Sequence, residues 1–317
     1  MILFLITFTP CALLAEFNQE DLSVSGYVRG IYLNQENGVL NSTDTFTLRE
    51  VALRADYTFN TYFYASLEFD LKSDQIWEAY LEALYPDNYG VKFGQFIIPF
   101  GIEVVRRGFQ TKTIDRPLGL QELFFDYYNA RDIGVAASAK YKYLITDISF
   151  VNGSGWENRD DDAKKTTAGR LLFSVKNFIF GGSFYDGSYF DEYSRDRDRF
   201  GASLIIKGEF DTLEVEWYRG EDDKIKSEGW YVQGGMGVPL LSPQALHYVP
   251  IRGLFRFEQW DPNRKLERDK ISILTFGLEY KPYNFLAVQL NYEIHQEEVK
   301  EAEIDNDIFL AQIQIVF

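Results

Sequence analysis

The residues with the clearest potential for chemistry are basic side chains gathered in one stretch of an otherwise acidic chain. The 317 residues include 48 acidic and 32 basic ones, a formal net charge of −16. The stretch 98–130 nevertheless brings together four cations, namely Arg106, Arg107, Lys112 and Arg116. Glu103 and Asp115 lie among them. Cations held between walls of low dielectric constant act strongly on passing ions, so this stretch is a candidate ion-selecting constriction.

Further charged side chains fall on segments that alternate like strands. Arg49 and Arg54 are candidates to line a passage beside the 98–130 stretch. Other cations expected on the same wall are Arg29, Arg170, Lys207, Arg252 and Arg256. The carboxylates expected there are Glu68, Asp70, Glu78, Glu82, Asp147, Glu214, Glu216, Glu258 and Glu279. This mixture of signs leaves an anion-selective passage and a mixed or cation-favouring passage both open. Ion pairing that merely tethers 98–130 to the wall is the alternative role, and the two roles are compatible.

The residues needed for enzymatic chemistry do not form a recognisable motif. The two histidines, His247 and His295, have no evident serine partner in the sequence, and no G-x-S-x-G or H-E-x-x-H pattern occurs. A hydrolase acting on lipid would need a serine beside a lipid-facing histidine. Acidic runs at 221–223 and 303–307 could hold Ca²⁺, although solvated loops explain them as well. We therefore expect no catalytic residue, no metal site and no cofactor.

Extended segments with a two-residue period must position these side chains. Between positions 63 and 71, Phe63, Leu67 and Leu71 share one face, while Glu68 and Asp70 take the other. The same two-faced pattern appears in the ranges 200–207, 213–218, 286–293 and 309–317. A Lys or Arg that faces lipid at mid-bilayer costs about 2–4 kcal/mol. The charged faces are therefore expected to surround an aqueous lumen, and the apolar faces to contact lipid.

The connections between these segments alternate in length, with one exception at 238–247, which falls where a short turn is due. Short turns are expected near 58, 85, 141, 176, 209 and 281. Longer loops are expected at 35–43, 98–130, 153–165, 188–197, 220–227, 261–270 and 296–306. The count of about sixteen strands predicts an all-β, transmembrane antiparallel β-barrel with short periplasmic turns and longer external loops. A soluble β-sandwich is the alternative, but it leaves the uniformly apolar outer faces unexplained.

Two details refine this barrel. The last strand keeps its alternation up to Phe317 and is expected to pair with the first strand near 22–34, which leaves no open edge. In the second strand the alternation slips at Arg49-Glu50, which predicts a β-bulge at that point.

The start of the chain has the character of an export signal. Residues 2–14 are mostly apolar and small residues precede Glu16, so we expect a signal peptide over 1–15 and a single barrel over 16–317. The single cysteine, Cys11, lies in that signal. No stretch approaches the roughly 18 to 20 apolar residues of a membrane-spanning helix, which excludes a helical membrane protein. The acidic net charge argues against nucleic acid as a partner.

Several stretches resemble the phosphate-selective porin family of the O and P type. The most specific is VKFGQFIIPFGIE, which is similar to a G-Q-F-x-x-P-F-x-x-E stretch of that family. Weaker similarities are TIDRPLG, ARDIGVAASAKY, FTLREVALRADYTF and EGWYVQGG. At Arg49-Glu50 the chain departs from the adjacent arginines of the family. The resemblance implies a 16-stranded outer-membrane channel, commonly a homotrimer, with its third external loop folded into the pore.

Three functions follow as hypotheses. The first is passive diffusion of small hydrophilic solutes or ions, including anions such as phosphate, through a water-filled barrel in the bacterial outer membrane. The second is a barrel enzyme acting on lipid, and the third is a structural or adhesive barrel. The partners expected for the first are small polar or ionic solutes, outer-membrane lipid and lipopolysaccharide, with further copies of the chain in a trimer.

Overall fold

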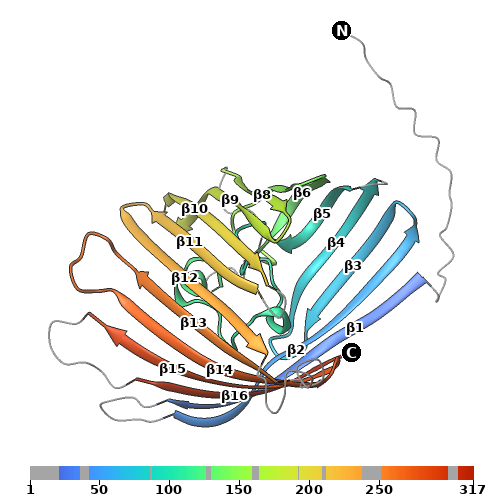
Figure 1. Cartoon of the computed structure of the whole chain (residues 1–317). Helices are drawn as coiled ribbons and strands as arrows, with labels where there is room; N and C mark the ends of the chain where they lie inside the picture. The colour runs from blue at the N-terminus through green and yellow to red at the C-terminus, as the bar shows by residue number, and fades with distance from the viewer. Residues whose placement is uncertain are drawn as a thin grey trace, which may run out of the picture.

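The computed structural model describes residues 21–35, 43–85, 88–125, 130–158, 164–191, 193–208, 212–237, 251–298 and 306–317. Sixteen antiparallel strands close into one barrel in which each strand pairs with its neighbours in the sequence (Figure 1). The prediction of an all-β, 16-stranded barrel is confirmed. The expected signal peptide and His247 lie outside the described residues.

The strands differ in length around the barrel. The first half consists of β1 (Leu22–Gln35), β2 (Thr43–Asn60), β3 (Phe63–Asp70), β4 (Gln75–Tyr85), β5 (Tyr89–Ile97), β6 (Arg131–Tyr141), β7 (Leu144–Val151) and β8 (Thr166–Val175). The second half consists of β9 (Phe178–Asp191), β10 (Tyr193–Lys207), β11 (Thr212–Asp222), β12 (Ile225–Gly237), β13 (Ile251–Asp261), β14 (Ile271–Tyr283), β15 (Leu286–Glu297) and β16 (Ile308–Val316).

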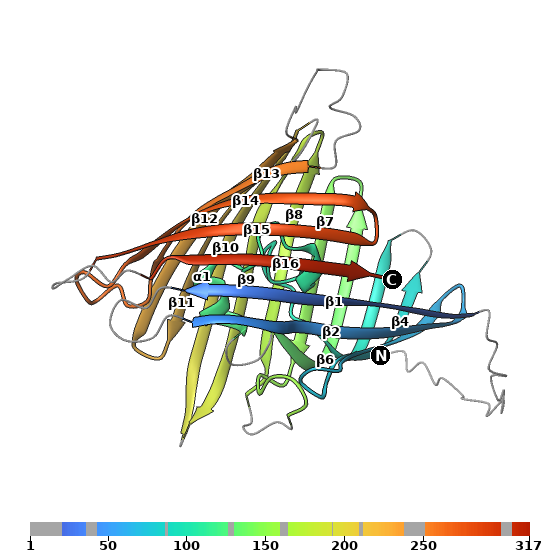
Figure 2. The same ribbon diagram turned by 90° about the horizontal axis from the view of Figure 1, so that it is seen from below.

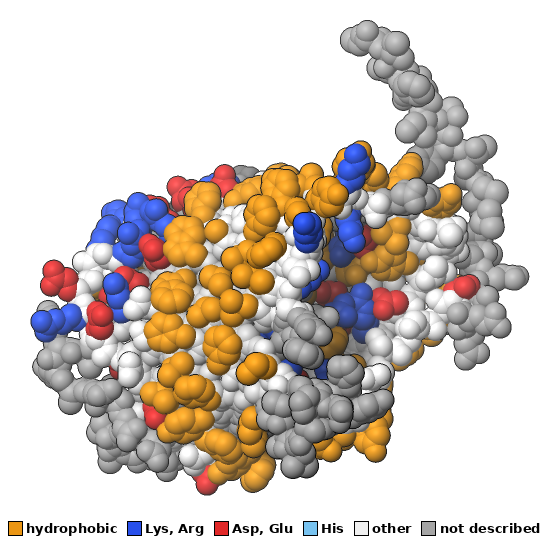
Figure 3. All heavy atoms as spheres, viewed as in Figure 1, with side chains coloured by type: hydrophobic (Ala, Val, Ile, Leu, Met, Phe, Trp, Pro, Cys, Tyr) orange, Lys and Arg blue, Asp and Glu red, His pale blue; other side chains and the backbone are white. Residues whose placement is uncertain are grey.

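The two faces of the strands separate as the alternation predicts. Large apolar side chains of the outer face are exposed, among them Phe63, Leu67, Phe200, Leu290 and Ile313. Figure 3 shows hydrophobic side chains gathered in a broad band over the visible face of the barrel. Charged side chains of the inner face are buried, among them Glu68, Asp70, Glu214, Glu216 and Glu293. An apolar exterior around a charged interior is the arrangement of a transmembrane β-barrel.

The barrel closes between the two ends of the chain. Strand β1 pairs with β16, and the two strands lie side by side in Figure 2. The backbone N–H of Gly26 donates to the carbonyl of Phe317 over 2.8 Å, and the N–H of Phe317 donates to the carbonyl of Gly26 over 2.9 Å. The pairing therefore continues to the last residue, and no strand edge is left open among the described strands.

The predicted β-bulge is present in β2. Arg29 pairs with Glu50 and Gly30 pairs with Leu48, so Arg49 is an extra residue without a partner in β1. The bulge shifts the outward positions from the odd-numbered to the even-numbered residues, and Phe46 is 83% exposed as a result. Arg49 and Glu50 both turn toward the lumen, where each contacts an inward-facing partner.

Two of the expected long loops are wrong. The range 188–197 is strand up to Asp191 and from Tyr193 onward, and only two residues separate β11 from β12. Both ranges are polar in composition, but polar composition does not show whether a backbone is paired in a sheet. The two ranges therefore resemble loops in composition, although the backbone of β9–β10 and of β11–β12 stays paired. Within the described part of the chain, no helix is long and apolar enough to cross a bilayer.

Candidate pore constriction

The segment between β5 and β6 lies inside the barrel (Figure 1). Its described residues, 98–125 and 130, include three short helical turns, η2 (Gly108–Gln110), α1 (Leu118–Leu120) and η3 (Gln121–Phe125). Apolar side chains give it a core of its own against inward-facing aromatic residues of the wall, and the members of this core include Phe100, Val104, Leu120, Tyr218, Tyr231 and Trp260. We call this stretch the inserted segment.

One side of the inserted segment is fixed to the wall through its backbone. The Arg29 guanidinium donates to the carbonyl of Ile114 over 2.9 Å, and the Gln289 amide donates to the carbonyl of Lys112 over 2.6 Å. Arg256 donates to the carbonyl of Asp115 and pairs with the Glu258 carboxylate over 2.9 Å. These partners belong to β1, β13 and β15 and are almost fully buried. We call this the closed side of the segment.

A buried carboxylate fixes the start of the segment. Glu216 of β11 accepts hydrogen bonds from the backbone N–H groups of Ile102 over 3.0 Å and Glu103 over 3.4 Å, and from the Tyr231 hydroxyl over 2.8 Å. Gly101 has a φ of +55°, and a Cβ atom there would lie 1.8 Å from a Glu216 carboxylate oxygen. Only glycine allows the chain to pass this close to the anchoring carboxylate.

Arg106 ties the segment to β11 through its side chain. Its two terminal nitrogens lie 2.7 Å and 2.6 Å from the two carboxylate oxygens of Glu214, and the first also lies 2.6 Å from Glu103. Lys112 lies 3.9 Å from the same Glu214 carboxylate. Burial lowers the pKa of Arg106, but the neighbouring Glu103 and Glu214 outweigh it and raise that pKa above its ordinary value. Arg106 is therefore a permanent cation held by two buried carboxylates.

Arg107 reaches the opposite wall. Its guanidinium lies 3.3 Å from Glu68 of β3 and 3.5 Å from Glu78 of β4. Arg54 of β2 binds the same two carboxylates over 3.0 Å and 2.8 Å, and also donates to the Tyr80 hydroxyl over 2.9 Å. About a quarter of the Arg107 side chain (26%) stays exposed, which leaves it accessible from the lumen.

The remaining predicted site residues act within the segment or at the bulge. Arg116 donates to the carbonyls of Glu103 and Arg106, and burial lowers its pKa to about 10, which still leaves it charged at neutral pH. Arg49 pairs with Asp115. The structure thus brings all seven predicted residues to one region of the lumen, and each makes ion pairs or hydrogen bonds that hold the segment or the adjacent wall.

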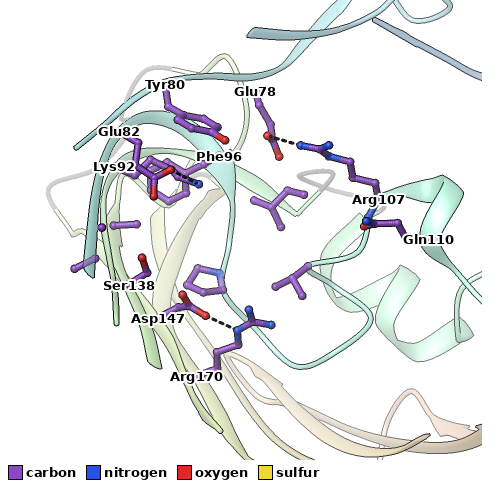
Figure 4. Close-up of a pocket in the computed structure, with 16 residues that line it drawn as sticks. Glu78, Tyr80, Glu82, Lys92, Phe96, Arg107, Gln110, Ser138, Asp147 and Arg170 are labelled. Carbon is purple, nitrogen blue, oxygen red and sulfur yellow. Dashed lines mark hydrogen bonds and ion pairs between the residues drawn. The ribbon is translucent and has the colours of Figure 1, made fainter. Parts of the chain in front are cut away.

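Two cavities of several hundred cubic ångströms lie beside the described part of the inserted segment. The lateral cavity, about 390 Å³, lies between the segment and β4–β8, and its charged lining consists of Glu78, Glu82, Lys92, Arg107, Asp147 and Arg170 (Figure 4). The turn-side cavity, about 470 Å³, lies near the strand ends that short turns connect. Its charged lining consists of Arg106, Lys112, Lys207, Arg252, Lys281, Glu214 and Glu279. The lateral cavity therefore balances its charges, whereas the turn-side cavity has an excess of cations.

The sequence analysis missed several lining residues. Lys92, Tyr80 and Phe96 line the lateral cavity, and Lys281 lines the turn-side cavity. The available signal for Lys92 was its position between the outward-facing residues Val91 and Phe93 of β5, which are 53% and 64% exposed. This signal is weak because β5 is short and Lys92 is its one charged residue. Gly90 and Gly94, which share the face of Lys92, have no side chain that would show whether this face is polar.

The orientation of His295 argues against the lipid-hydrolase alternative. His295 lies on the inward-facing side of β15, and its Nε2 atom is 3.5 Å from a Glu293 carboxylate oxygen. His295 is therefore not the lipid-facing histidine that a lipid hydrolase would need. The described residues contain no group of three or more metal-ligating side chains.

Solved structures share this fold over almost the whole chain. An anion-selective porin from Comamonas acidovorans matches with a TM-score of 0.70 at 9% identity, covering 93% of this chain and 99% of its own. OmpF from Salmonella typhi, solved in complex with daunomycin, matches with a TM-score of 0.69 at 11% identity, covering 93% and 97%. OmpT of Vibrio cholerae, in a trimer form, matches with a TM-score of 0.64 at 13% identity, covering 93% and 99%. The fold is therefore that of a 16-stranded porin.

Comparisons at the level of sequence add no family. No protein-family profile matches the chain, and no curated protein matches it. The shared fold is that of porins in general, and the resemblance to the O and P type stays a prediction from the sequence.

Proposed function

We propose that this protein is a porin of the bacterial outer membrane, a passive diffusion channel for small hydrophilic solutes and ions. The observation that carries the proposal is the inserted segment. It narrows a closed, charge-lined barrel and leaves the lateral and turn-side cavities beside it, both lined by charged side chains. Sixteen strands enclose a lumen wide enough for water and small solutes when a segment fills only part of it.

Ion preference is the finer part of this proposal. Among the charged residues that line the turn-side cavity, five are cations and two are carboxylates. A cavity of this composition concentrates anions. The balanced lateral cavity adds no preference of its own. We therefore propose a modest preference for anions, which includes inorganic phosphate, rather than a strict filter. Of the selectivity residues predicted from the sequence, Arg106, Arg107 and Lys112 face a cavity. The other four, Arg49, Arg54, Arg116 and Glu103, help to position them.

The assembly and export of the protein belong to the same proposal. The similarity to OmpT in its trimer form supports a homotrimer. We propose outer-membrane lipid and lipopolysaccharide as the partners of its apolar exterior. A signal peptide over residues 1–15 would direct the chain across the inner membrane.

Conductance in a planar bilayer tests the function. Purified protein should insert with discrete conductance steps in KCl, and a KCl gradient should give a reversal potential of the sign expected for anions. Lys207→Gln combined with Lys281→Gln should move that potential toward zero, because both side chains line the turn-side cavity. The control Lys142→Gln lies in the turn between β6 and β7 and should change nothing. Absence of any conductance would refute the channel. A cation-selective potential would refute only the preference.

A further inference from the structure

The lateral cavity contains a cage that already holds an ammonium group. The Nζ atom of Lys92 lies 4.0 Å from the centre of the Tyr80 ring and 5.9 Å from the centre of the Phe96 ring. It also lies 3.6 Å from a carboxylate oxygen of Glu82. Two aromatic faces with one carboxylate are the groups that recognise an ammonium ion in proteins. Lys92 thus occupies this cage as a ligand carried by the chain itself.

The three residues that form the cage are buried, whereas the Lys92 side chain that occupies it is partly exposed. Tyr80, Phe96 and Glu82 are at most 8% exposed. Glu82 accepts a hydrogen bond from the Tyr64 hydroxyl, and the Tyr80 hydroxyl accepts one from Arg54, so both groups are held in place. The Lys92 side chain is 25% exposed and lines the cavity. A flexible lysine can leave such a cage, whereas the cage keeps its shape without it.

Cations stand across the cavity from this cage. Figure 4 shows Tyr80, Glu82, Lys92 and Phe96 on one side of the open space, Arg107 on the other, and Arg170 at a third position. Arg107 pairs with Glu68 and Glu78, and Arg170 pairs with Asp147 over 2.7 Å, but the two arginine side chains remain 26% and 20% exposed. Guanidinium groups are well suited to bind a carboxylate. The cavity therefore presents an ammonium-binding wall and carboxylate-binding groups to the same small volume.

We infer that the lateral cavity is a binding subsite for small zwitterionic solutes that carry an ammonium group and a carboxylate. The ammonium of the solute displaces Lys92 from the cage of Tyr80, Phe96 and Glu82, and the carboxylate contacts Arg107 or Arg170. A volume of about 390 Å³ suits a ligand of this size. This inference rests on the proposed function as a channel and names a class of solute for it.

The competition with Lys92 gives the inference an uncommon signature. Lys92→Met removes the internal occupant while keeping the apolar part of the side chain, so binding of the zwitterion should tighten. Glu82→Gln keeps the acceptor for Tyr64 but removes the negative charge, so binding should weaken. The two variants should therefore shift affinity in opposite directions. Lys207→Met makes the same chemical change in the turn-side cavity and serves as the matched control.

The experiment measures solute entry into liposomes that contain the purified full-length protein. The probe is glycine betaine, which carries a quaternary ammonium and a carboxylate, and the reference is erythritol, a neutral solute of similar size. Entry of glycine betaine should saturate with concentration, while entry of erythritol should stay proportional to concentration. Lys92→Met should lower the half-saturating concentration by about threefold or more, and Glu82→Gln should raise it by a similar factor.

Each outcome bears on one claim. Proportional entry of glycine betaine in a protein that conducts KCl would overturn the subsite and leave the channel intact. A weaker half-saturation in Lys92→Met would also overturn it, because Lys92 would then be a ligand for the solute rather than a competitor. An equal change in Lys207→Met would assign the effect to the overall charge of the lumen. Loss of KCl conductance in the wild-type protein would instead remove the channel itself.

Discussion

The two sides of the inserted segment use the same residue types for different purposes. On the closed side, Arg29 and Arg256 are 2% and 1% exposed. Each binds a carboxylate of the barrel wall and a backbone carbonyl of the segment. We call the side of the segment that faces the lateral cavity the open side. There, the side chains of Arg107 and of Lys92 on β5 line the cavity and are each about a quarter exposed. A count of charged residues inside the lumen would not distinguish the buried arginines from the partly exposed cations.

The comparison separates structural charges from functional ones. A buried charge must be fully paired, because its removal from water costs several kcal/mol, and loss of one partner typically costs about 3–5 kcal/mol. A partly exposed pair contributes about 0–1 kcal/mol and can be exchanged for water or a solute. Selectivity should therefore depend on the open side, and attachment of the segment on the closed side.

The largest effect should come from breaking a pair on the closed side. Arg256→Met leaves the carboxylates of Glu258 and Glu293 buried without their shared cation. We expect the free energy of unfolding to fall by about 3–5 kcal/mol, as measured by denaturant unfolding in detergent followed by tryptophan fluorescence.

A matched control lies on the same strand. Arg252 pairs with Glu279 over 3.0 Å, but its side chain is 32% exposed. Arg252→Met should therefore cost less than about 1 kcal/mol. Equal losses in the two variants would show that exposure does not separate the two kinds of charge, and the comparison would fail.

An intermediate effect should follow from strain at the anchor of the segment. Gly101→Ala forces a Cβ atom against the Glu216 carboxylate at a positive φ, which should cost about 1–3 kcal/mol. A loosened segment should also make the open-channel current noisier in bilayer recordings. Gly237→Ala has no heavy atom within 4 Å of the added Cβ and should leave stability and current unchanged. If the open-channel current of Gly101→Ala were no noisier than that of the wild-type protein, Glu216 would not be what holds the segment.

The smallest effect on stability, with a clear effect on ions, should come from the open side. Arg107→Gln should cost less than about 1 kcal/mol of stability and move the reversal potential toward cations, because Glu68 and Glu78 lose part of their compensation. Arg106→Gln is the contrasting variant, since it strands Glu103 and Glu214, which are 1% and 2% exposed. It should lose clearly more stability. An unchanged reversal potential in Arg107→Gln, or a loss of stability as large as that of Arg106→Gln, would show that Arg107 is a structural charge.

The barrel could be predicted from the sequence because its rule is local. Alternation within one strand fixes which face meets lipid, so Phe63 and Glu68 reveal their sides without any knowledge of distant residues. The bulge at Arg49 could be predicted for the same reason, since it appears as a slip in that alternation. The loops expected at 188–197 and 220–227 were wrong, because a polar composition does not show whether the backbone is paired with a neighbouring strand.

The site could be predicted only as a set of residues. The cations of the inserted segment are visible in the sequence, but their partners are far away in it: Glu214 lies 108 positions from Arg106, and Gln289 lies 177 positions from Lys112. Which arginine is buried and which faces a cavity depends on how the segment packs across the lumen. No local pattern encodes that packing. The contact of Lys92 with Tyr80 and Phe96 could not be predicted for the same reason.

The extra residue in β2 has a consequence for how such a barrel can change. In a regular strand, every second side chain faces inward, and one inserted residue would reverse all positions beyond it. At Arg49 the insertion is absorbed on the spot, so two successive side chains face the lumen and the apolar exterior resumes at Leu48. A lineage can thus acquire or lose one lumen-facing side chain by a single codon insertion or deletion, without altering the number of strands or their contact with lipid.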